Sequence, residues 1–377
     1  MKYEKALLDE IYTPKGGEVF VEASNVPLEW FSPFDKSRFN IINTEFKDDN
    51  HFLRFSPQEL KKIENVSNDV CFLAKFSAGI QMMFVTDARI IKLKCENITD
   101  FPMCNMPFVS RAGFDCYTKE KDEDEFQFHY STFAPNYEKG SSTKWEDFIL
   151  AFHENKKRIV LINFPLYNGV KELQIGIEQG RSVEPYYYGN KKRILCYGTS
   201  ILEGCSASRP GQATTNYLSM KLRQEVLNYG FSGSALCEKE VAEILATRKD
   251  IEMFIIDAEA NAGWSHALAD NFPDFVKIIN DAHPDTPIIV MNRVRCNQDD
   301  ENYSFINRMK EFNDKVLLDV VNEYKNKGKK IYFVDNFALF KDSSFTIDGL
   351  HPTSDGFEKI NESYLTAIRK VKEENYL

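Results

Sequence analysis

The 377-residue sequence lacks the short motifs that would assign a cofactor or metal chemistry directly. It contains no G-x-x-x-x-G-K-[ST] phosphate loop, no G-x-G-x-x-G dinucleotide fingerprint and no H-E-x-x-H zinc motif. It has no G-x-S-x-G either, which excludes the nucleophile elbow of the α/β-hydrolases. The 6 histidines show no metal-ligand spacing. The sequence therefore predicts neither a cofactor nor a metal.

A second group of absences concerns membranes and nucleic acids. No stretch approaches the roughly 18 apolar residues that cross a bilayer, and the opening MKYEKALLDEIY has no continuous apolar core of the signal-peptide kind. The net charge is -10, and no basic stripe would follow a phosphate backbone. The acidic run at 120–125 (EKDEDE) is typical of a solvated loop. We expect a soluble, cytoplasmic protein that binds neither membranes nor nucleic acids.

Cysteine usage agrees with that location. The 8 cysteines form no C-x-x-C pair and their spacing is irregular. Several lie within apolar segments, as Cys196 does in RILCYG. This pattern favours buried free thiols in a reducing compartment over a disulfide framework.

The two halves of the chain differ in texture, and the length suggests two domains. Before about residue 190, short apolar and aromatic runs are broken by clusters of Asn, Asp, Gly, Pro and Ser. This pattern favours many short strands, so we predict a β-sandwich, jelly-roll-like, over residues 1–185. The polar, turn-rich segment 180–192 (GRSVEPYYYGNKK) has the composition of a linker.

After the linker, short apolar runs alternate with longer helical patterns. We expect five strands, at 193–198, 226–231, 253–258, 287–292 and 330–335. We expect helices at about 213–224, 236–247, 268–281, 303–327 and 355–373. Such alternation predicts a parallel sheet, here a three-layer α/β/α domain of flavodoxin-like type over residues 190–377. Ligands of these sheets bind beyond the carboxyl ends of the strands.

The candidate residues come directly after the predicted strands and before the last helix. Ser200, Gly233 and Asn261 follow the first three strands, and Asp348 and His351 precede the final helix. Each has an ordinary reading by itself, as a helix cap, a turn glycine, a loop amide or a surface turn. The functional hypothesis depends on their joint placement at one edge of the sheet.

Acyl transfer requires these residue types. Serine is a weak nucleophile until a base removes its proton, and His351 would do this for Ser200. Asp348 would fix the tautomer and orientation of that imidazole. The backbone amides of Ser200 and Gly233, with the side-chain amide of Asn261, would form the oxyanion hole.

The same segments resemble the conserved blocks of the SGNH (GDSL-like) hydrolases. The matching segments, in order, are YGTSI (197–201), NYGFSG (228–233), DAEAN (257–261) and DGLHP (348–352). Two positions depart from the family pattern: Thr199 replaces the usual Asp before the nucleophile, and Ala262 follows Asn261.

A closer resemblance covers nearly the whole chain. RAGFDCY (111–117) matches the G-x-D-L-Y motif of an SGNH subgroup with an N-terminal β-sandwich, with Cys116 in place of Leu. FPLYNGV (164–170) and the stretch at 204–222 are also similar to that subgroup. The resemblance implies an acyl esterase related to carbohydrate deacetylases. Its substrate would be a short-chain ester, acetyl first, of a small molecule or an oligosaccharide.

Alternative functions remain open at this point. An acyltransferase could use the same triad to pass the acyl group to an acceptor other than water. A flavodoxin-like cofactor binder could use GTSILEG (198–204) as a phosphate loop. A catalytically inactive carbohydrate-binding protein is the third. The sequence leaves the oligomeric state undetermined.

Four further residues have two readings each. Arg209 could line the pocket and bind a substrate oxygen, or it could pair with a carboxylate to fix its loop. Asp115 and Tyr117 are predicted to fix a turn at the domain junction, with direct substrate contact as the alternative. Trp264 could lie at the rim of the substrate pocket.

Overall fold

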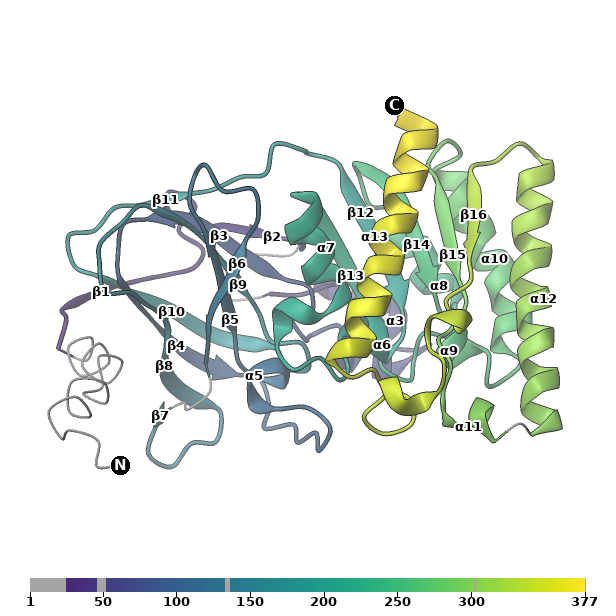
Figure 1. Ribbon diagram of the computed structural model, residues 1–377, viewed down its shortest axis with the longest axis horizontal. Coiled ribbons are helices and arrows are strands. Elements are labelled where there is room, and N and C mark those ends of the chain that lie inside the picture. Colours follow the sequence, from purple (N-terminus) through teal and green to yellow (C-terminus); the bar gives the residue numbers. More distant parts are fainter. Residues whose placement is uncertain (1–24, 46–51, 133–135, 302, 377) are drawn as a thin grey trace, which may run out of the picture.

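A computed structural model describes residues 25–45, 52–132, 136–301 and 303–376 of the protein. Antiparallel sheets occupy one end of the molecule, and a parallel sheet with its helices occupies the other (Figure 1). All antiparallel strands precede Arg193, where the first parallel strand begins. The predicted fold classes of both parts are confirmed. The division into domains at 185–190 stays a prediction, and its first 24 residues lie outside the described ranges.

Two antiparallel sheets form the N-terminal sandwich. One has the order β1-β10-β4-β8-β7, and the other β11-β3-β9-β5-β6 with β2 paired to β3. Their strands are β1 (Leu28–Phe31), β2 (Asn40–Ile42), β3 (Gln81–Thr86), β4 (Ile90–Asn97), β5 (Asp115–Lys119), β6 (Gln127–Ser131), β7 (Asn136–Tyr137), β8 (Lys144–Ala151), β9 (Arg158–Asn163), β10 (Val170–Glu178) and β11 (Val183–Pro185). Inward residues of both sheets, including Phe84 and Trp145, share one apolar cluster. Face-to-face packing of this kind defines a sandwich.

The N-terminal part also contains helices that strand-like patterning alone does not predict. These are α3 (Pro57–Ile63), α4 (Asn68–Leu73) and α5 (Phe108–Arg111). Helix α3 begins with a capping box, in which the Ser56 side chain accepts from the Glu59 amide and Glu59 bonds back to the Ser56 amide.

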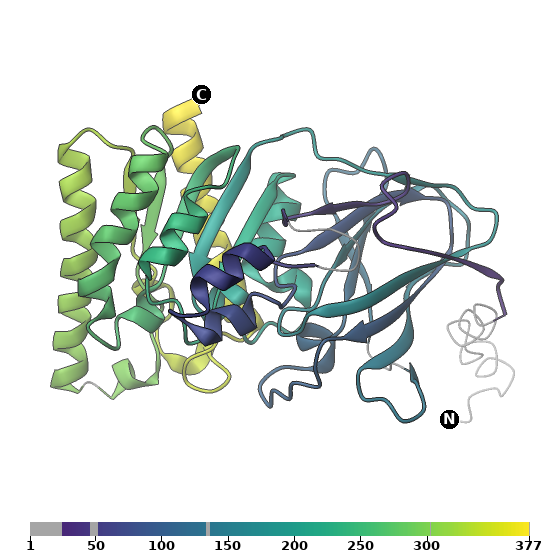
Figure 2. The ribbon, with the colours of Figure 1, turned by 180° about the vertical axis from the view of Figure 1, so that it is seen from behind.

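Helices α3 and α4 do not pack into the sandwich. Their buried residues Ile63, Val70 and Leu73 belong to the apolar cluster that also holds Leu227 and Tyr229 of the parallel sheet. Figure 2 shows these dark-blue helices lying beside the parallel sheet. A segment of the first half of the sequence therefore completes the core of the second half.

The parallel sheet has the order β13-β12-β14-β15-β16. Its strands are β12 (Arg193–Gly198), β13 (Glu225–Gly230), β14 (Ile251–Asp257), β15 (Ile288–Met291) and β16 (Ile331–Val334), and each lies within about two residues of its expected place. The first strand in sequence lies next to both the second and the third. This is the order of a flavodoxin-like sheet, so the carboxyl ends of β12, β13 and β14 are adjacent.

Helices cover both faces of this sheet (Figure 1). They are α6 (Ser200–Glu203), α7 (Thr214–Leu222), α8 (Lys239–Leu245), α9 (Glu259–Ala262), α10 (Ala267–Ala282), α11 (Asn297–Asp300), α12 (Ser304–Asn326) and α13 (Ser354–Tyr376), with 3₁₀ turns η1 (Pro210–Gln212), η2 (Phe337–Leu339) and η3 (Ser343–Phe345). Successive side chains of β14 point to opposite faces of the sheet. Phe254 and Ile256 pack with α10 and α12, whereas Met253 and Ile255 pack with α13. The three-layer prediction is thereby confirmed.

Two observations bear on the expected environment of the protein. Within the described ranges, no helix has an apolar stretch long enough to cross a bilayer. All eight cysteines are free thiols; six are buried, Cys71 is half-buried and Cys104 is exposed.

Candidate active site

Ser200 lies at the carboxyl edge of the parallel sheet, as the first residue of α6. Strand β12 ends at Gly198, and Thr199 caps the helix through its side chain. A Cβ at Gly198 would lie 2.7 Å from the Asp257 carbonyl oxygen, so glycine is required for this close approach of β12 and β14. The turn holds Ser200 at the sheet edge with 5% of its surface exposed.

The structure brings Ser200, His351 and Asp348 together, although 151 residues separate the first two. Ser200 Oγ lies 3.0 Å from His351 Nε2. His351 Nδ1 lies 2.7 Å from Asp348 Oδ2. The Asp348 Oδ1 atom accepts the backbone N–H of His351 at 2.8 Å, which closes the turn between them. A continuous hydrogen-bonded chain therefore runs from a serine hydroxyl through an imidazole to a carboxylate.

The carboxylate of Asp348 has a further donor that the sequence did not indicate. Asn105, from the N-terminal half, donates through Nδ2 to Asp348 Oδ2 at 3.0 Å. Partial burial would raise the pKa of Asp348, but hydrogen bonds from the His351 backbone and ring, and then from Asn105, lower it to about 2. Asp348 is therefore ionised throughout the neutral range.

Gly233 and Asn261 lie on adjoining segments after β13 and β14. Gly233 is exposed and has a φ of 69°, in the left-handed region that favours glycine. The Asn261 Oδ1 atom accepts the backbone N–H of Ala235 at 3.3 Å, which ties α9 to the turn containing Gly233. The Asn261 Nδ2 atom donates to the Ala260 carbonyl at 3.2 Å. An amide NH₂ group has two N–H donors, so this bond uses one of them.

A buried ion pair joins the Ser200 helix to the Gly233 segment, and sequence reasoning missed it. Arg54 Nη2 lies 2.8 Å from Glu203 Oε1, and both side chains are buried. Glu203 Oε2 accepts the backbone N–H of Ser232 at 2.9 Å, and Arg54 donates to the Gly230 carbonyl. Burial raises the pKa of Glu203 to about 7, against the opposing effect of the Arg54 charge.

The backbone of the Ser200 turn has another buried partner in the sandwich segment. Tyr167 donates its hydroxyl proton to the Ser200 carbonyl oxygen at 3.2 Å. Tyr167 lies in the FPLYNGV segment, which the sequence had connected with the G-x-D-L-Y subgroup but not with the serine. The N-terminal half thus contacts the candidate site through Asn105, Arg54 and Tyr167.

Asp115 and Tyr117 fix the junction between the two parts. Asp115 is fully buried; its Oδ2 accepts the Gly211 N–H at 2.8 Å, and its Oδ1 accepts from Asn163 at 2.7 Å. Burial raises the pKa of Asp115 to about 7. A Cβ at Gly211 would lie 2.3 Å from the Tyr117 ring. These contacts agree with the junction-fixing reading of both residues.

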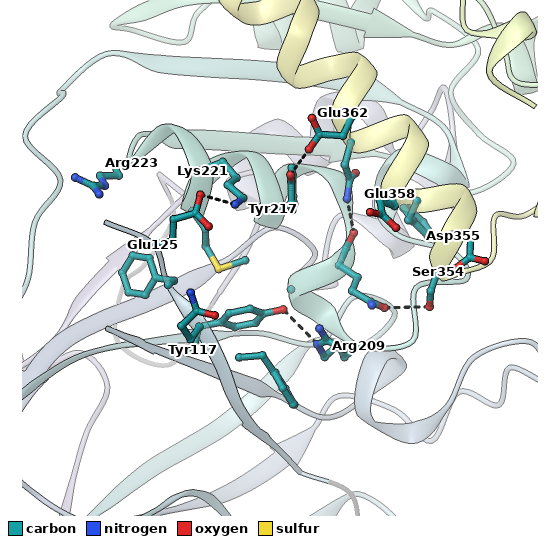
Figure 3. A pocket seen from close by; sticks show the side chains of 18 of the residues that line it. Tyr117, Glu125, Arg209, Tyr217, Lys221, Arg223, Ser354, Asp355, Glu358 and Glu362 are labelled. Carbon is teal, nitrogen blue, oxygen red and sulfur yellow. Dashed lines mark hydrogen bonds and ion pairs between the residues drawn. The ribbon is translucent and has the colours of Figure 1, made fainter. Parts of the chain in front are cut away.

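Arg209 lies on the wall of a cleft between the two parts, beside that junction (Figure 3). Its Nε atom donates to the Tyr117 hydroxyl at 3.2 Å and lies 3.7 Å from Asp115 Oδ2. It therefore pairs with a carboxylate while 30% of its side chain remains exposed. Both readings of Arg209 are compatible with this position, because pairing from one side leaves the other side open.

Trp264 is partly exposed, three residues after Asn261. Its backbone N–H donates to the Asn261 carbonyl at 3.3 Å, and the Arg293 guanidinium lies 5.4 Å from its ring centroid. Arg293 is itself buried and makes a two-point contact with Asp299, at 2.6 and 2.7 Å. The Trp264 ring therefore packs against a fixed arginine, next to the segment that carries Asn261.

Family comparisons divide the chain in the same way as its sheets. The sequence model of the GDSL-like Lipase/Acylhydrolase family matches residues 191–369. The model of the GxDLY N-terminus of SGNH hydrolase-type esterases matches residues 28–183. A comparison with curated protein sequences finds no match.

Solved structures share the fold over most of the chain. A GDSL-like lipase from Bacteroides ovatus aligns with a TM-score of 0.80 and 27% identity, covering 92% of this chain and 98% of its own. The salicylyl-acyltransferase SsfX3 of a tetracycline biosynthetic pathway aligns at 0.70 and 14% identity, covering 91% and 98%. The acetyl xylan esterase Est2A from Butyrivibrio proteoclasticus aligns at 0.55 and 11% identity, covering 91% and 99%. The chain therefore belongs to the SGNH (GDSL-like) hydrolase family, in the group with a GxDLY N-terminal region, and is an ester-hydrolysing enzyme.

Proposed function

We propose that this enzyme hydrolyses short-chain carboxylic esters, acetyl esters first, carried by a carbohydrate. The observation that carries the proposal is the hydrogen-bonded chain Ser200–His351–Asp348, with distances of 3.0 and 2.7 Å. This is the arrangement in which a base activates a serine hydroxyl and a carboxylate orients the base.

The proposed reaction proceeds in two halves. Ser200 Oγ attacks the acyl carbon while its proton passes to His351 Nε2, and the Asp348 carboxylate stabilises the imidazolium. The oxyanion accepts hydrogen bonds from the Ser200 and Gly233 amides and from Asn261. His351 then protonates the departing alcohol, leaving an acyl-enzyme. Water attacks that ester with the same base, and the carboxylic acid is released.

Support for the substrate class is of two kinds. The family is one of acyl ester hydrolases, and two solved structures with the same fold are an acetyl xylan esterase and a carbohydrate esterase from Clostridium thermocellum in complex with cellohexaose. The alternative is transfer of the acyl group to an acceptor other than water, and its support is the similarity to the salicylyl-acyltransferase. Fold alone does not distinguish these outcomes.

The first test compares acyl chains and acceptors. We expect kcat/KM to be highest for p-nitrophenyl acetate and to fall at least tenfold by the octanoate ester. We expect free acetate to be the main product from acetylated xylo-oligosaccharides, as measured by chromatography. The control repeats the reaction with added alcohols and unmodified sugars. If the acyl group goes mainly to an added acceptor, the enzyme is a transferase; if no ester is cleaved, the proposal is wrong.

A second prediction concerns Asn105. Replacing Asn105 with Ala removes one donor from Asp348, so the carboxylate loses part of its orientation, and kcat should fall about tenfold with KM little changed. Asn105→Asp places a second carboxylate beside Asp348 and raises the pKa of Asp348. The acid side of the kcat/KM profile should then move to higher pH, because Asp348 no longer stays ionised far below neutrality.

Steady-state kinetics with p-nitrophenyl acetate from pH 4 to 9 provides the measurement. The matched control is Cys104→Ala, a neighbouring exposed side chain, which should leave kcat and the profile unchanged. If Asn105→Ala has the same kcat and pH profile as Cys104→Ala, Asn105 has no part in positioning the Asp348 carboxylate.

A further inference from the structure

A cleft of about 720 Å³ lies between the β5–β6 hairpin, η1, α7 and α13 (Figure 3). Its volume is that of a small-molecule site. Ser200, His351 and Asp348 do not line it. It lies close to them in the chain, because Ser354 follows His351 by three residues and Arg209 lies nine residues after Ser200.

Arg209 is held from behind on one wall of this cleft. Its Nε atom contacts the Tyr117 hydroxyl and the Asp115 carboxylate. Its guanidinium carbon lies 4.2 Å from the centroid of the Phe128 ring. Its two terminal nitrogens have no acceptor among the described residues. An arginine fixed in this way loses little entropy when a ligand oxygen accepts its remaining N–H groups.

Asn361 supplies an unused acceptor. This residue lines the cleft from α13 and is only 4% exposed. Its Nδ2 donates to the Gln212 carbonyl at 3.0 Å, but its Oδ1 is buried and has no partner in the described parts of the chain. A buried unsatisfied carbonyl costs about 1–3 kcal/mol, so an acceptor without a partner lies in the wall of the cleft.

The charges around the cleft mostly neutralise one another. Glu125 pairs with Lys221 at 2.7 Å, and Asp124 lies 3.5 Å from Arg223. On α13, three exposed carboxylates that line the cleft have no ion-pair partner within the described ranges: Asp355, Glu358 and Glu362. Glu362 accepts a hydrogen bond from the Tyr217 hydroxyl. In Figure 3, Glu358 lies on the cleft side of α13, on the other wall from Arg209.

Donors and acceptors on facing walls select a particular ligand chemistry. A strongly anionic ligand would meet the carboxylates of α13, and a cationic ligand would meet Arg209. A neutral polyhydroxylated molecule both donates and accepts hydrogen bonds, and its C–H faces can pack on the Phe126 and Phe128 rings that also line the cleft. The combination fits a sugar chain.

We propose that this cleft binds a neutral oligosaccharide, as a subsite for sugar units beyond the one that carries the ester. The inference rests on the proposed esterase function for its role in catalysis, but binding itself can be measured without any ester. It would give the enzyme a preference for oligomeric over monomeric substrates.

Isothermal titration calorimetry of the full-length protein with unmodified xylohexaose and cellohexaose tests the proposal. We expect binding of at least one of them, weakened tenfold or more by Arg209→Met, which keeps the apolar stem and removes the donors. Glu358→Ala, on the opposite wall, should weaken binding at least threefold and does not touch the Asp115 junction. Glu172→Ala, an exposed substitution on β10, is the matched control and should have no effect.

Each outcome of the titrations either supports or overturns the proposed oligosaccharide subsite. Binding that depends on both Arg209 and Glu358 supports the subsite. No detectable binding at millimolar sugar, binding insensitive to both substitutions, or binding only of an acidic oligosaccharide such as a galacturonic acid hexamer would each overturn it. Because these titrations use no ester, their result is independent of whether the esterase proposal holds.

Discussion

Replacing Ser200 with Ala lowers kcat for p-nitrophenyl acetate by about 10⁴- to 10⁶-fold, to near the background rate. The Ser200 hydroxyl oxygen forms the acyl-enzyme, and no neighbouring group in the proposed mechanism replaces it. His351→Ala should cause a loss of similar size, because serine without its base is a poor nucleophile. Stopped assays with long incubation and high enzyme concentration provide the measurement.

Asn261→Ala tests the oxyanion hole separately from the catalytic triad. Loss of one oxyanion donor lowers kcat about 10²- to 10³-fold. The matched control is His153→Ala, an exposed histidine of the sandwich part, which should keep the full rate. A Ser200→Ala enzyme within tenfold of the wild type would contradict the mechanism. Full activity in Asn261→Ala would remove only the third donor.

Replacing Arg54 with Met should destabilise the fold strongly, by about 3–5 kcal/mol. The change leaves the Glu203 carboxylate buried without its cation, while the Ser232 N–H remains its donor. Breaking one partner of a buried pair costs more than the pair contributed, because the remaining charge stays desolvated. Urea unfolding followed by circular dichroism measures the free energy.

The loss should depend on pH in a defined direction. Burial holds the pKa of Glu203 above its unfolded value, at about 7 in the wild type, and removal of Arg54 raises it further. A raised carboxyl pKa stabilises the fold at low pH, and this contribution disappears as pH rises through the folded pKa. Arg54→Met should therefore be more destabilising at pH 8 than at pH 5.

Two further variants make this prediction specific. The double variant Arg54→Met, Glu203→Gln should recover part of the lost stability, because it removes the uncompensated charge. Lys277→Met breaks an exposed pair with Asp281 on α10 and should cost less than about 1 kcal/mol. Equal losses for Arg54→Met and Lys277→Met would show that burial of the first pair has no energetic consequence.

The parallel part of the fold was predictable because each element carries its own signal. Apolar runs bounded by turns placed all five strands, and the longer amphipathic stretches placed α7, α8, α10, α12 and α13. The strand order then made the ends of β12, β13 and β14 adjacent, which is why short segments after those strands could be assigned to one site.

The missed features are of two kinds. Helices α3 and α4 lie between aromatic strand-like runs, yet α3 had a readable signal in Ser56-Pro57-Gln58-Glu59, a capping box with Pro at the first helical position. The pairings of Arg54 with Glu203 and of Asn105 with Asp348 had none, since 149 and 243 residues separate the partners. Periodicity reports which face of an element is buried, but it does not report which distant side chain meets it.

The packing of α3 and α4 against the parallel sheet has an evolutionary consequence. A module that is attached only by a linker can be gained, lost or exchanged between genes without damage to its neighbour. In this protein, removal of the N-terminal region would strip apolar cover from the α/β core and take away Arg54, Asn105 and Tyr167 from the surroundings of Ser200. Substitutions on either side of this interface are therefore constrained by the residues on the other side.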